Sequence, residues 1–140
     1  MEKWIVYAFI SMGFAGFTSV IAKLGLTGIS GELGLTIRTI FVFVFVLIFA
    51  VIFIPKQDLS SLTQQNMFWL ALSSLATFLS WLYYYRALKL GDVSTIAIID
   101  KGSFIVAILL AWIILKEQIT LRIVIGCAFI LTGLLIVSRK

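Results

Sequence analysis

The stretch that decides the fold is residues 93–115, which read VSTIAIIDKGSFIVAILLAWIIL. The run is apolar apart from a few small polar side chains and the pair Asp100-Lys101, and it can cross a bilayer as one helix, which takes about 20 residues. An acid and a base near the middle of such a helix each cost about 2.5–3.5 kcal/mol on insertion scales, so they indicate a functional site by default. Because adjacent helical residues point about 100° apart, we expect Asp100 and Lys101 to have different neighbours rather than to pair with each other.

Composition places the chain among membrane proteins. Of its 140 residues 62% are hydrophobic and 12% are charged, whereas a soluble domain has about 45–50% and 25%. The apolar runs are continuous, which favours helices over the short alternating strands of a barrel. The net charge of +5 comes from Lys and Arg scattered at the ends of apolar runs, where they reach the membrane interface, so we expect no nucleic-acid partner. The chain has no histidine and a single cysteine, Cys127, and we predict no metal, no cofactor and no enzymatic activity.

The apolar runs predict an all-α membrane protein, a bundle of five transmembrane helices in a single domain of residues 1–140. The expected spans cover about residues 4–25, 33–54, 67–88, 93–115 and 121–137. Pro55 ends the second of them and opens the longest polar stretch, residues 55–66. Phe41–Phe53 has no polar side chain, which suggests that much of it faces lipid.

The third span carries a stripe of hydroxyl groups at helical spacing. Its members are Ser73, Thr77, Ser80 and Tyr84. The stripe predicts either the lining of a cavity or hydrogen bonds between helices, which average about 0.6 kcal/mol per contact. Trp81 lies too deep for an aromatic belt at the interface, so we expect it to form a cavity wall.

A second embedded cation lies in the second span. Arg38 is about 7 Å inside the membrane edge by helix rise, close to the expected depth of Asp100. We therefore predict an Arg38–Asp100 pair or a shared network, with Lys101 left facing a cavity and Ser103 below it. The alternatives are that Arg38 reaches the headgroups, or that the charges only fix helix packing.

The last span predicts contact with another helix. Gly126 and Gly133 are seven residues apart and share a face, which favours close approach within the chain or to another chain. The Lys and Arg counts on the two sides of the predicted topology differ by only about one usable charge, a weak orientation signal. Insertion in both directions and an antiparallel dimer are one outcome, and a single orientation with a parallel assembly or a partner is the other.

Several motifs resemble a known family. They are SWLYYYRALKLGDVS at 80–94, Ile99-Asp100-Lys101, Leu115-Lys116-Glu117 and the segment from Gly126 to Gly133, with Ile37–Ile40 and Ala22-Lys23 as further matches. Together they resemble the EamA-like domain of the drug/metabolite transporter superfamily, and most closely its single-domain, five-span bacterial and archaeal branch. The resemblance covers essentially the whole chain, with its specific part at residues 80–134.

The resemblance implies half of a ten-helix inverted-repeat transporter. Most members fuse two such domains with the solute site near the midplane between them, so this chain is expected to form a homodimer, with an antiparallel arrangement as one option. Gly126 and Gly133 resemble the glycines through which the small multidrug resistance proteins dimerise. The family often has a proline where this chain has Ile98, so any bend would come from Gly102.

Residues and resemblance together predict a secondary transporter or facilitator in the inner cell membrane, with several spans. It would move a small anionic or zwitterionic metabolite by alternating access in a homodimer, and its other partner would be membrane lipid. The predicted site comprises Asp100, Lys101, Arg38, Trp81, Tyr84, Ser103, Ser73, Thr77 and Ser80, and the predicted dimer interface comprises Gly126 and Gly133. The alternatives are a flippase subunit for a lipid-linked head group and a non-transporting scaffold or accessory subunit.

Overall fold

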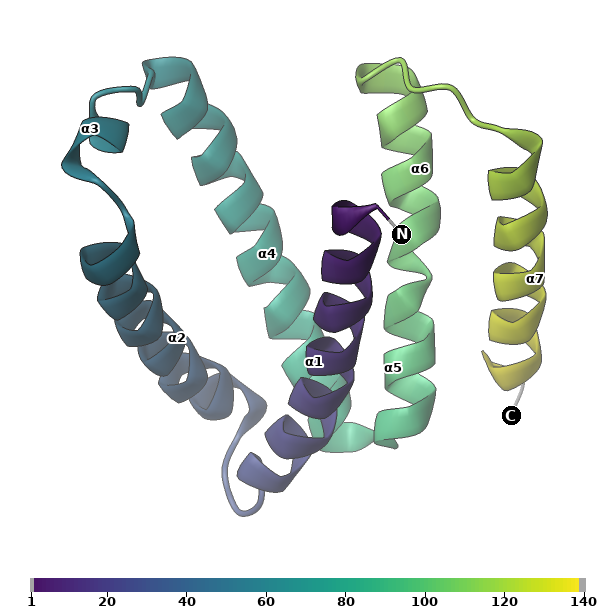
Figure 1. The fold of residues 1–140 in the computed structure, drawn as a ribbon. Helices are drawn as coiled ribbons and strands as arrows, with labels where there is room; N and C mark the ends of the chain where they lie inside the picture. Colours follow the sequence, from purple (N-terminus) through teal and green to yellow (C-terminus); the bar gives the residue numbers. More distant parts are fainter. Residues whose placement is uncertain (1, 139–140) are drawn as a thin grey trace. The chain divides into compact units, whose positions relative to one another are not determined.

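The computed structural model of the protein describes residues 2–138 (Figure 1). These residues form seven helices and no strand, which confirms the predicted all-helical class. The helices are α1 (Lys3–Gly25), α2 (Gly31–Phe53), α3 (Lys56–Leu59), α4 (Gln64–Leu90), α5 (Val93–Lys101), α6 (Ser103–Ile114) and α7 (Leu121–Ser138). They form two compact units, Ala22–Leu90 on one hand and Met1–Ile21 with Gly91–Lys140 on the other.

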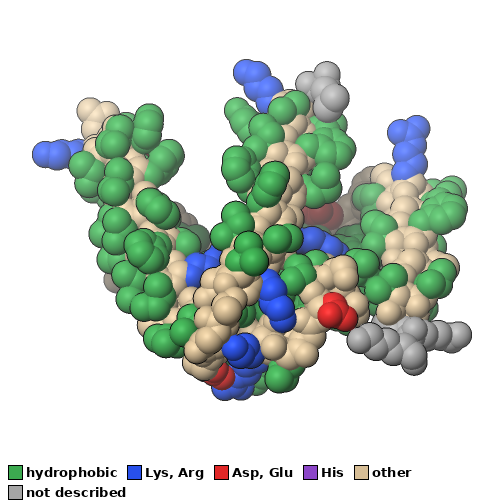
Figure 2. Space-filling model, turned by 90° about the horizontal axis from the view of Figure 1, so that it is seen from below, with side chains coloured by type: hydrophobic (Ala, Val, Ile, Leu, Met, Phe, Trp, Pro, Cys, Tyr) green, Lys and Arg blue, Asp and Glu red, His purple; other side chains and the backbone are tan. Residues whose placement is uncertain are grey.

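Length and hydropathy separate the helices into two groups. Among the described residues, four segments are long and apolar enough to span a membrane: Lys3–Gly25, Gly31–Phe53, Gln64–Leu90 and Val93–Ile114. The apolar part of α7, Leu121–Val137, is shorter than these four but still within the range of about 17–25 residues that span membranes. Large hydrophobic side chains are exposed along the helices, and Figure 2 shows them spread over the face seen there, as expected where the surrounding solvent is lipid.

Local signals explain where α2 begins and ends. Ser30 is its N-cap, and the hydroxyl oxygen accepts a hydrogen bond from the Leu33 amide at 3.2 Å. Such caps satisfy one of the first unpaired amides of a helix. Gly28 precedes it with a φ of 77°, a conformation that glycine adopts without strain. Pro55 follows the end of α2, because the residue before a proline is disfavoured in helical geometry.

In the unit Ala22–Leu90, α2 and α4 pack side by side in antiparallel directions, and they draw apart toward α3 (Figure 1). Gly31 makes the close approach possible, since a Cβ at this position would lie 2.9 Å from the Tyr85 carbonyl oxygen. Leu35, Tyr85 and Leu88 are almost fully buried along this contact, together with Leu26 in the turn before α2. The best-packed core of the unit is therefore at the end of α4 and the start of α2.

The fourth predicted span is interrupted. The chain forms α5 up to Lys101 and begins α6 at Ser103, and the Gly102 amide donates to the Ile99 carbonyl at 2.9 Å in a tighter turn. A Cβ at Gly102 would lie 3.0 Å from a methyl carbon of Leu134 on α7. The span predicted over 93–115 is therefore covered by α5 and α6 together, and its irregular turn lies at Gly102, which has weak helix propensity and packs closely against a neighbouring helix.

Candidate solute-binding site

The embedded arginine of α2 lies against an aromatic wall supplied by α4. The Arg38 guanidinium carbon is 4.3 Å from the centre of the Trp81 ring and 5.9 Å from that of Tyr85. Trp81 and Tyr85 are one helical turn apart and so share a face of α4. A guanidinium over an aromatic face is stabilised by about 0.5–2 kcal/mol, more as water is removed. The ring of Trp81 thus lies against Arg38, and its expected role as the wall of a cavity stays a prediction.

Arg38 keeps unused hydrogen-bonding capacity. Its Nη1 atom is buried and has no hydrogen-bond partner among the described residues. Aromatic rings attract the cation through their faces but accept no strong hydrogen bond from its N–H groups. An unsatisfied buried donor on a charged group costs several kcal/mol, so this atom is suited to an incoming acceptor, best an anionic oxygen.

The hydroxyl stripe lies on the same side of the α2–α4 contact as Arg38. Helix periodicity places Arg38 and Trp81 to one side of the line through Leu35 and Tyr85, and the stripe of Ser73, Thr77, Ser80 and Tyr84 continues that side on α4. Ser73, Thr77 and Ser80 are exposed and Tyr84 is half-buried. The Thr77 hydroxyl donates to the Ser73 carbonyl at 2.9 Å. The oxygen of Thr77 can still accept a bond, so the stripe offers acceptors and donors beside the arginine.

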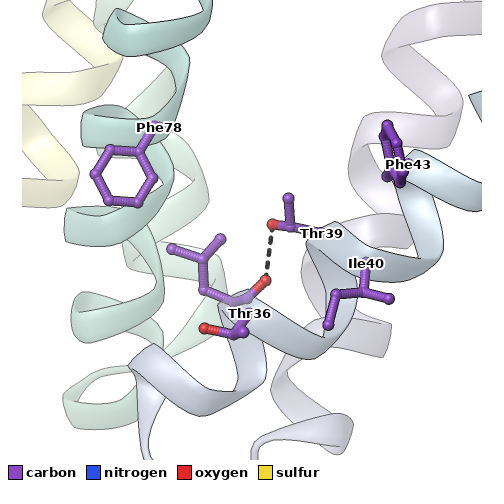
Figure 3. A pocket seen from close by; sticks show the side chains of 6 residues that line it. Thr36, Thr39, Ile40, Phe43 and Phe78 are labelled. Atoms are coloured by element: carbon purple, nitrogen blue, oxygen red, sulfur yellow. Dashed lines mark hydrogen bonds between the residues drawn. The ribbon is translucent and has the colours of Figure 1, made fainter.

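The other side of the same contact holds a cavity of about 410 Å³ (Figure 3). We call it the α2–α4 cavity; it is lined by Leu35, Thr36, Thr39, Ile40, Phe43 and Phe78. The sequence does not predict this cavity, because much of the Phe-rich part of α2 is expected to face lipid. The available signal was the pair Thr36 and Thr39 among apolar neighbours, but the cavity itself depends on the packing of α2 against α4.

Charged side chains form contacts between helices at one end of the unit Ala22–Leu90. The ammonium of Lys23 donates to the Leu88 carbonyl near the end of α4, and that of Lys89 donates to the Leu26 carbonyl after α1 at 3.1 Å. Each lysine thus satisfies a carbonyl at the C-terminal end of the other helix, where positive charge is favourable. Arg86 pairs with Glu32 through Nε and Oε1 at 2.7 Å. These contacts involve Lys23, Lys89 and Arg86, three of the basic residues in the motifs noted above.

Asp100 and Lys101 lie in the other unit, at the interruption between α5 and α6. The Lys101 ammonium is 4.0 Å from a carboxylate oxygen of Asp100. The expectation that these neighbours cannot meet is wrong, because the helix ends at Lys101 and the lysine side chain is long enough to turn back. Ser103 opens α6 and is exposed. The predicted Arg38–Asp100 pair joins residues of different units and stays a prediction.

The predicted interface glycines of α7 have open surroundings. A Cβ at Gly126 or Gly133 would meet no atom within 4 Å among the described residues. Nothing in this part of the chain occupies their face. The assignment of these glycines to a dimer interface stays a prediction.

Comparison with known proteins agrees with the sequence motifs. The model of the EamA-like transporter family matches residues 2–139. A relative from Sinorhizobium sp, named "Uncharacterized transporter in cobO 3'region", is 34% identical over 137 residues, which cover 98% of this chain and 97% of that protein. No solved structure matches the chain. The chain therefore belongs to the EamA-like transporter family, within the drug/metabolite transporter superfamily, and is a multi-pass membrane transporter rather than an enzyme.

Proposed function

We propose that the protein is a secondary transporter or facilitator that moves a small anionic or zwitterionic metabolite across the inner cell membrane. The observation that carries this proposal is the Arg38 guanidinium, which rests on Trp81 and keeps a buried Nη1 without a hydrogen-bond partner. A solute carboxylate would supply the missing acceptor, and the hydroxyl stripe on the same side would bind its other polar groups.

The balance of embedded charge favours the same class of solute. Among the embedded residues, Arg38 and Lys101 are cationic and Asp100 is anionic. Their sum is one net positive charge within the membrane for each chain. Asp100 and Lys101 are partly exposed, with 41% and 61% of their side-chain surface accessible, so both can meet a solute or solvent. In our proposal Lys101 adds to solute binding, and Asp100 carries the proton if transport is proton-coupled.

A homodimer working by alternating access completes the proposal. Transporters of this type bind their solute near the midplane, between two repeats that rock against each other. One chain of this length supplies one repeat, so a second copy would supply the other. The open face of Gly126 and Gly133 on α7 supports this arrangement, because paired small residues allow helices to approach closely in lipid.

The test is uptake of labelled amino acids and small carboxylates by proteoliposomes that contain the purified protein. We expect Arg38→Gln to raise the KM of the transported solute about tenfold or more, since a hydrogen bond to a charged group contributes about 1.5–3 kcal/mol. Arg38→Lys should recover part of the affinity, because it restores the charge but not the forked geometry.

The matched control is Arg122→Gln, which removes an exposed arginine from the start of α7 and leaves Arg38 in place. Its uptake should equal that of the unchanged protein. Unchanged KM in Arg38→Gln, or an equal loss in both variants, would reject Arg38 as the group that binds the solute.

A further inference from the structure

We propose that the α2–α4 cavity binds one acyl chain of an anionic phospholipid, whose phosphate is held by Arg86. The cavity has a volume of about 410 Å³ and lies along segments of α2 and α4 that can span the membrane. Its side chains come from about two and a half turns of α2, residues 35–43, and from Phe78 of α4 (Figure 3). This site is distinct from the Arg38 site, which lies on the other side of the same helix pair.

The polar groups that line the cavity already donate hydrogen bonds within α2, so the cavity does not require a polar ligand. The Thr36 hydroxyl donates to the Glu32 carbonyl at 2.9 Å, and the Thr39 hydroxyl donates to the Leu35 carbonyl at 2.8 Å. Both hydroxyl protons are therefore used within α2 itself, a common arrangement for threonine in membrane helices. The remaining side chains of the lining are hydrocarbon, so a polar solute would lose its hydration there without compensation. In a membrane, the apolar ligand present at highest concentration is an acyl chain.

The headgroup end of the site is set by an ion pair on the same side of the helices. Helix periodicity places Glu32 and Arg86 on the cavity side of the α2–α4 contact. Glu32 precedes Thr36 by one turn, so the ion pair lies about 6 Å beyond the end of the cavity. That separation suits a lipid whose chain enters the cavity and whose phosphate stays near the membrane surface.

Arg86 has the capacity to bind a phosphate while it remains paired. Its bond to Glu32 uses Nε, and half of its side-chain surface is accessible. A guanidinium has five N–H donors, and its fork matches phosphate oxygens. Lys23 and Lys89 lie at the same end of the unit. With Arg86 and Glu32 they leave two net positive charges there, which favours an anionic over a neutral headgroup.

Native mass spectrometry of the full chain tests the headgroup part of the proposal. The protein is purified in mild detergent and incubated with equal amounts of phosphatidylglycerol and phosphatidylcholine. We expect retained phosphatidylglycerol to exceed phosphatidylcholine about fivefold, the ratio for about 1 kcal/mol per basic residue. Arg86→Gln should lower this ratio severalfold, although the one net positive charge that remains at this end leaves part of the preference.

The matched control for Arg86→Gln is Glu32→Gln, which breaks the same ion pair but keeps the arginine. It should preserve or raise the preference for phosphatidylglycerol, since Arg86 then has more donors free. An unchanged preference in Arg86→Gln, or an equal loss in both variants, would overturn the assignment of Arg86.

The cavity part has its own pair of variants. Thr39→Trp would fill the cavity and should lower the retention of both lipids, whereas Ile48→Trp places the same side chain at an exposed position of α2 outside the cavity lining and should not. Equal retention in the two variants would overturn the proposal.

A photo-crosslinking residue in place of Phe78 identifies the occupant directly. We expect it to label lipid in native membranes. Labelling of a second copy of the chain instead would show that the cavity is a subunit interface, and would overturn the proposal of a lipid site.

Discussion

At the scale of single residues, the contact between Arg38 and Trp81 is the feature that most directly affects transport. Trp81→Ala removes the ring that holds the guanidinium at 4.3 Å. We expect the KM of uptake to rise about threefold to thirtyfold, which corresponds to about 0.5–2 kcal/mol. Trp81→Phe keeps a smaller ring and should give an intermediate value in the same proteoliposome assay.

Trp112→Ala is the control for this series, because Trp112 is an exposed tryptophan near the end of α6. It should leave KM unchanged. A KM in Trp81→Ala equal to that of the unchanged protein would show that the ring does not orient Arg38 for the solute.

The sequence identified Arg38, Trp81, Asp100 and Lys101 as candidates because charges and deep aromatic rings stand out in apolar runs. It could not predict which of them meet. The predicted pairing of Arg38 with the carboxylate of Asp100 stays a prediction, and the contacts that the structure gives its guanidinium are with Trp81 and Tyr85 of α4. The depth of a residue in the membrane can be counted from the end of its span. The contact of a ring with a guanidinium depends instead on how two helices are rotated about their axes, which the sequence does not give. Asp100 and Lys101 meet only because the helix ends between α5 and α6.

At the scale of elements, the spans were predictable and their irregularities were not. The ends of α1 and α2 fall within two residues of the expected ones, since apolar length, Ser30 and Pro55 fix them. α4 begins three residues earlier than expected, because its first turn is polar. The irregular turn at Gly102 lies where the sequence allows a bend, but whether a bend occurs there depends on a neighbouring helix. The α2–α4 cavity also depends on a neighbouring helix, which a one-dimensional pattern does not contain.

Gly31 offers a test of the α2–α4 packing. Gly31→Ala would place a methyl group 2.9 Å from the Tyr85 carbonyl oxygen, a backbone atom that cannot easily move. We expect a loss of about 1–3 kcal/mol of stability, as for other overpacked sites, and a lower Tm in a thermal-shift measurement in detergent.

The control is Gly13→Ala in α1, where a Cβ would meet nothing within 4 Å. Alanine is the better helix former by about 1 kcal/mol, so the Tm should stay the same or rise. An equal fall in both variants would mean that helix packing at Gly31 is not the cause.

At the scale of the whole molecule, our proposal makes the chain one of two repeats that together form the transporter. Its helices present large apolar side chains at most positions, including Phe129 of α7, which is 77% exposed. Lipid can cover this surface, so exposure alone does not require a partner. The pair Gly126 and Gly133 is more specific, because glycines that favour close helix approach have no neighbour within 4 Å among the described residues.

We therefore expect the double variant Gly126→Leu with Gly133→Leu to disrupt the proposed homodimer. Leucines on this face would hold the two α7 helices apart and remove the van der Waals contact that stabilises helix association in lipid. Photobleaching of labelled protein in vesicles measures the monomer fraction as the protein-to-lipid ratio is lowered. The double variant should dissociate at a protein-to-lipid ratio at least tenfold higher than the unchanged chain does. Thr132→Leu, at an exposed position on another face of α7, should keep the dimer. If the double variant dimerises as well as this control, the second repeat must be recruited through a surface other than α7, and the likeness to the small multidrug resistance proteins would not extend to the way the chain assembles.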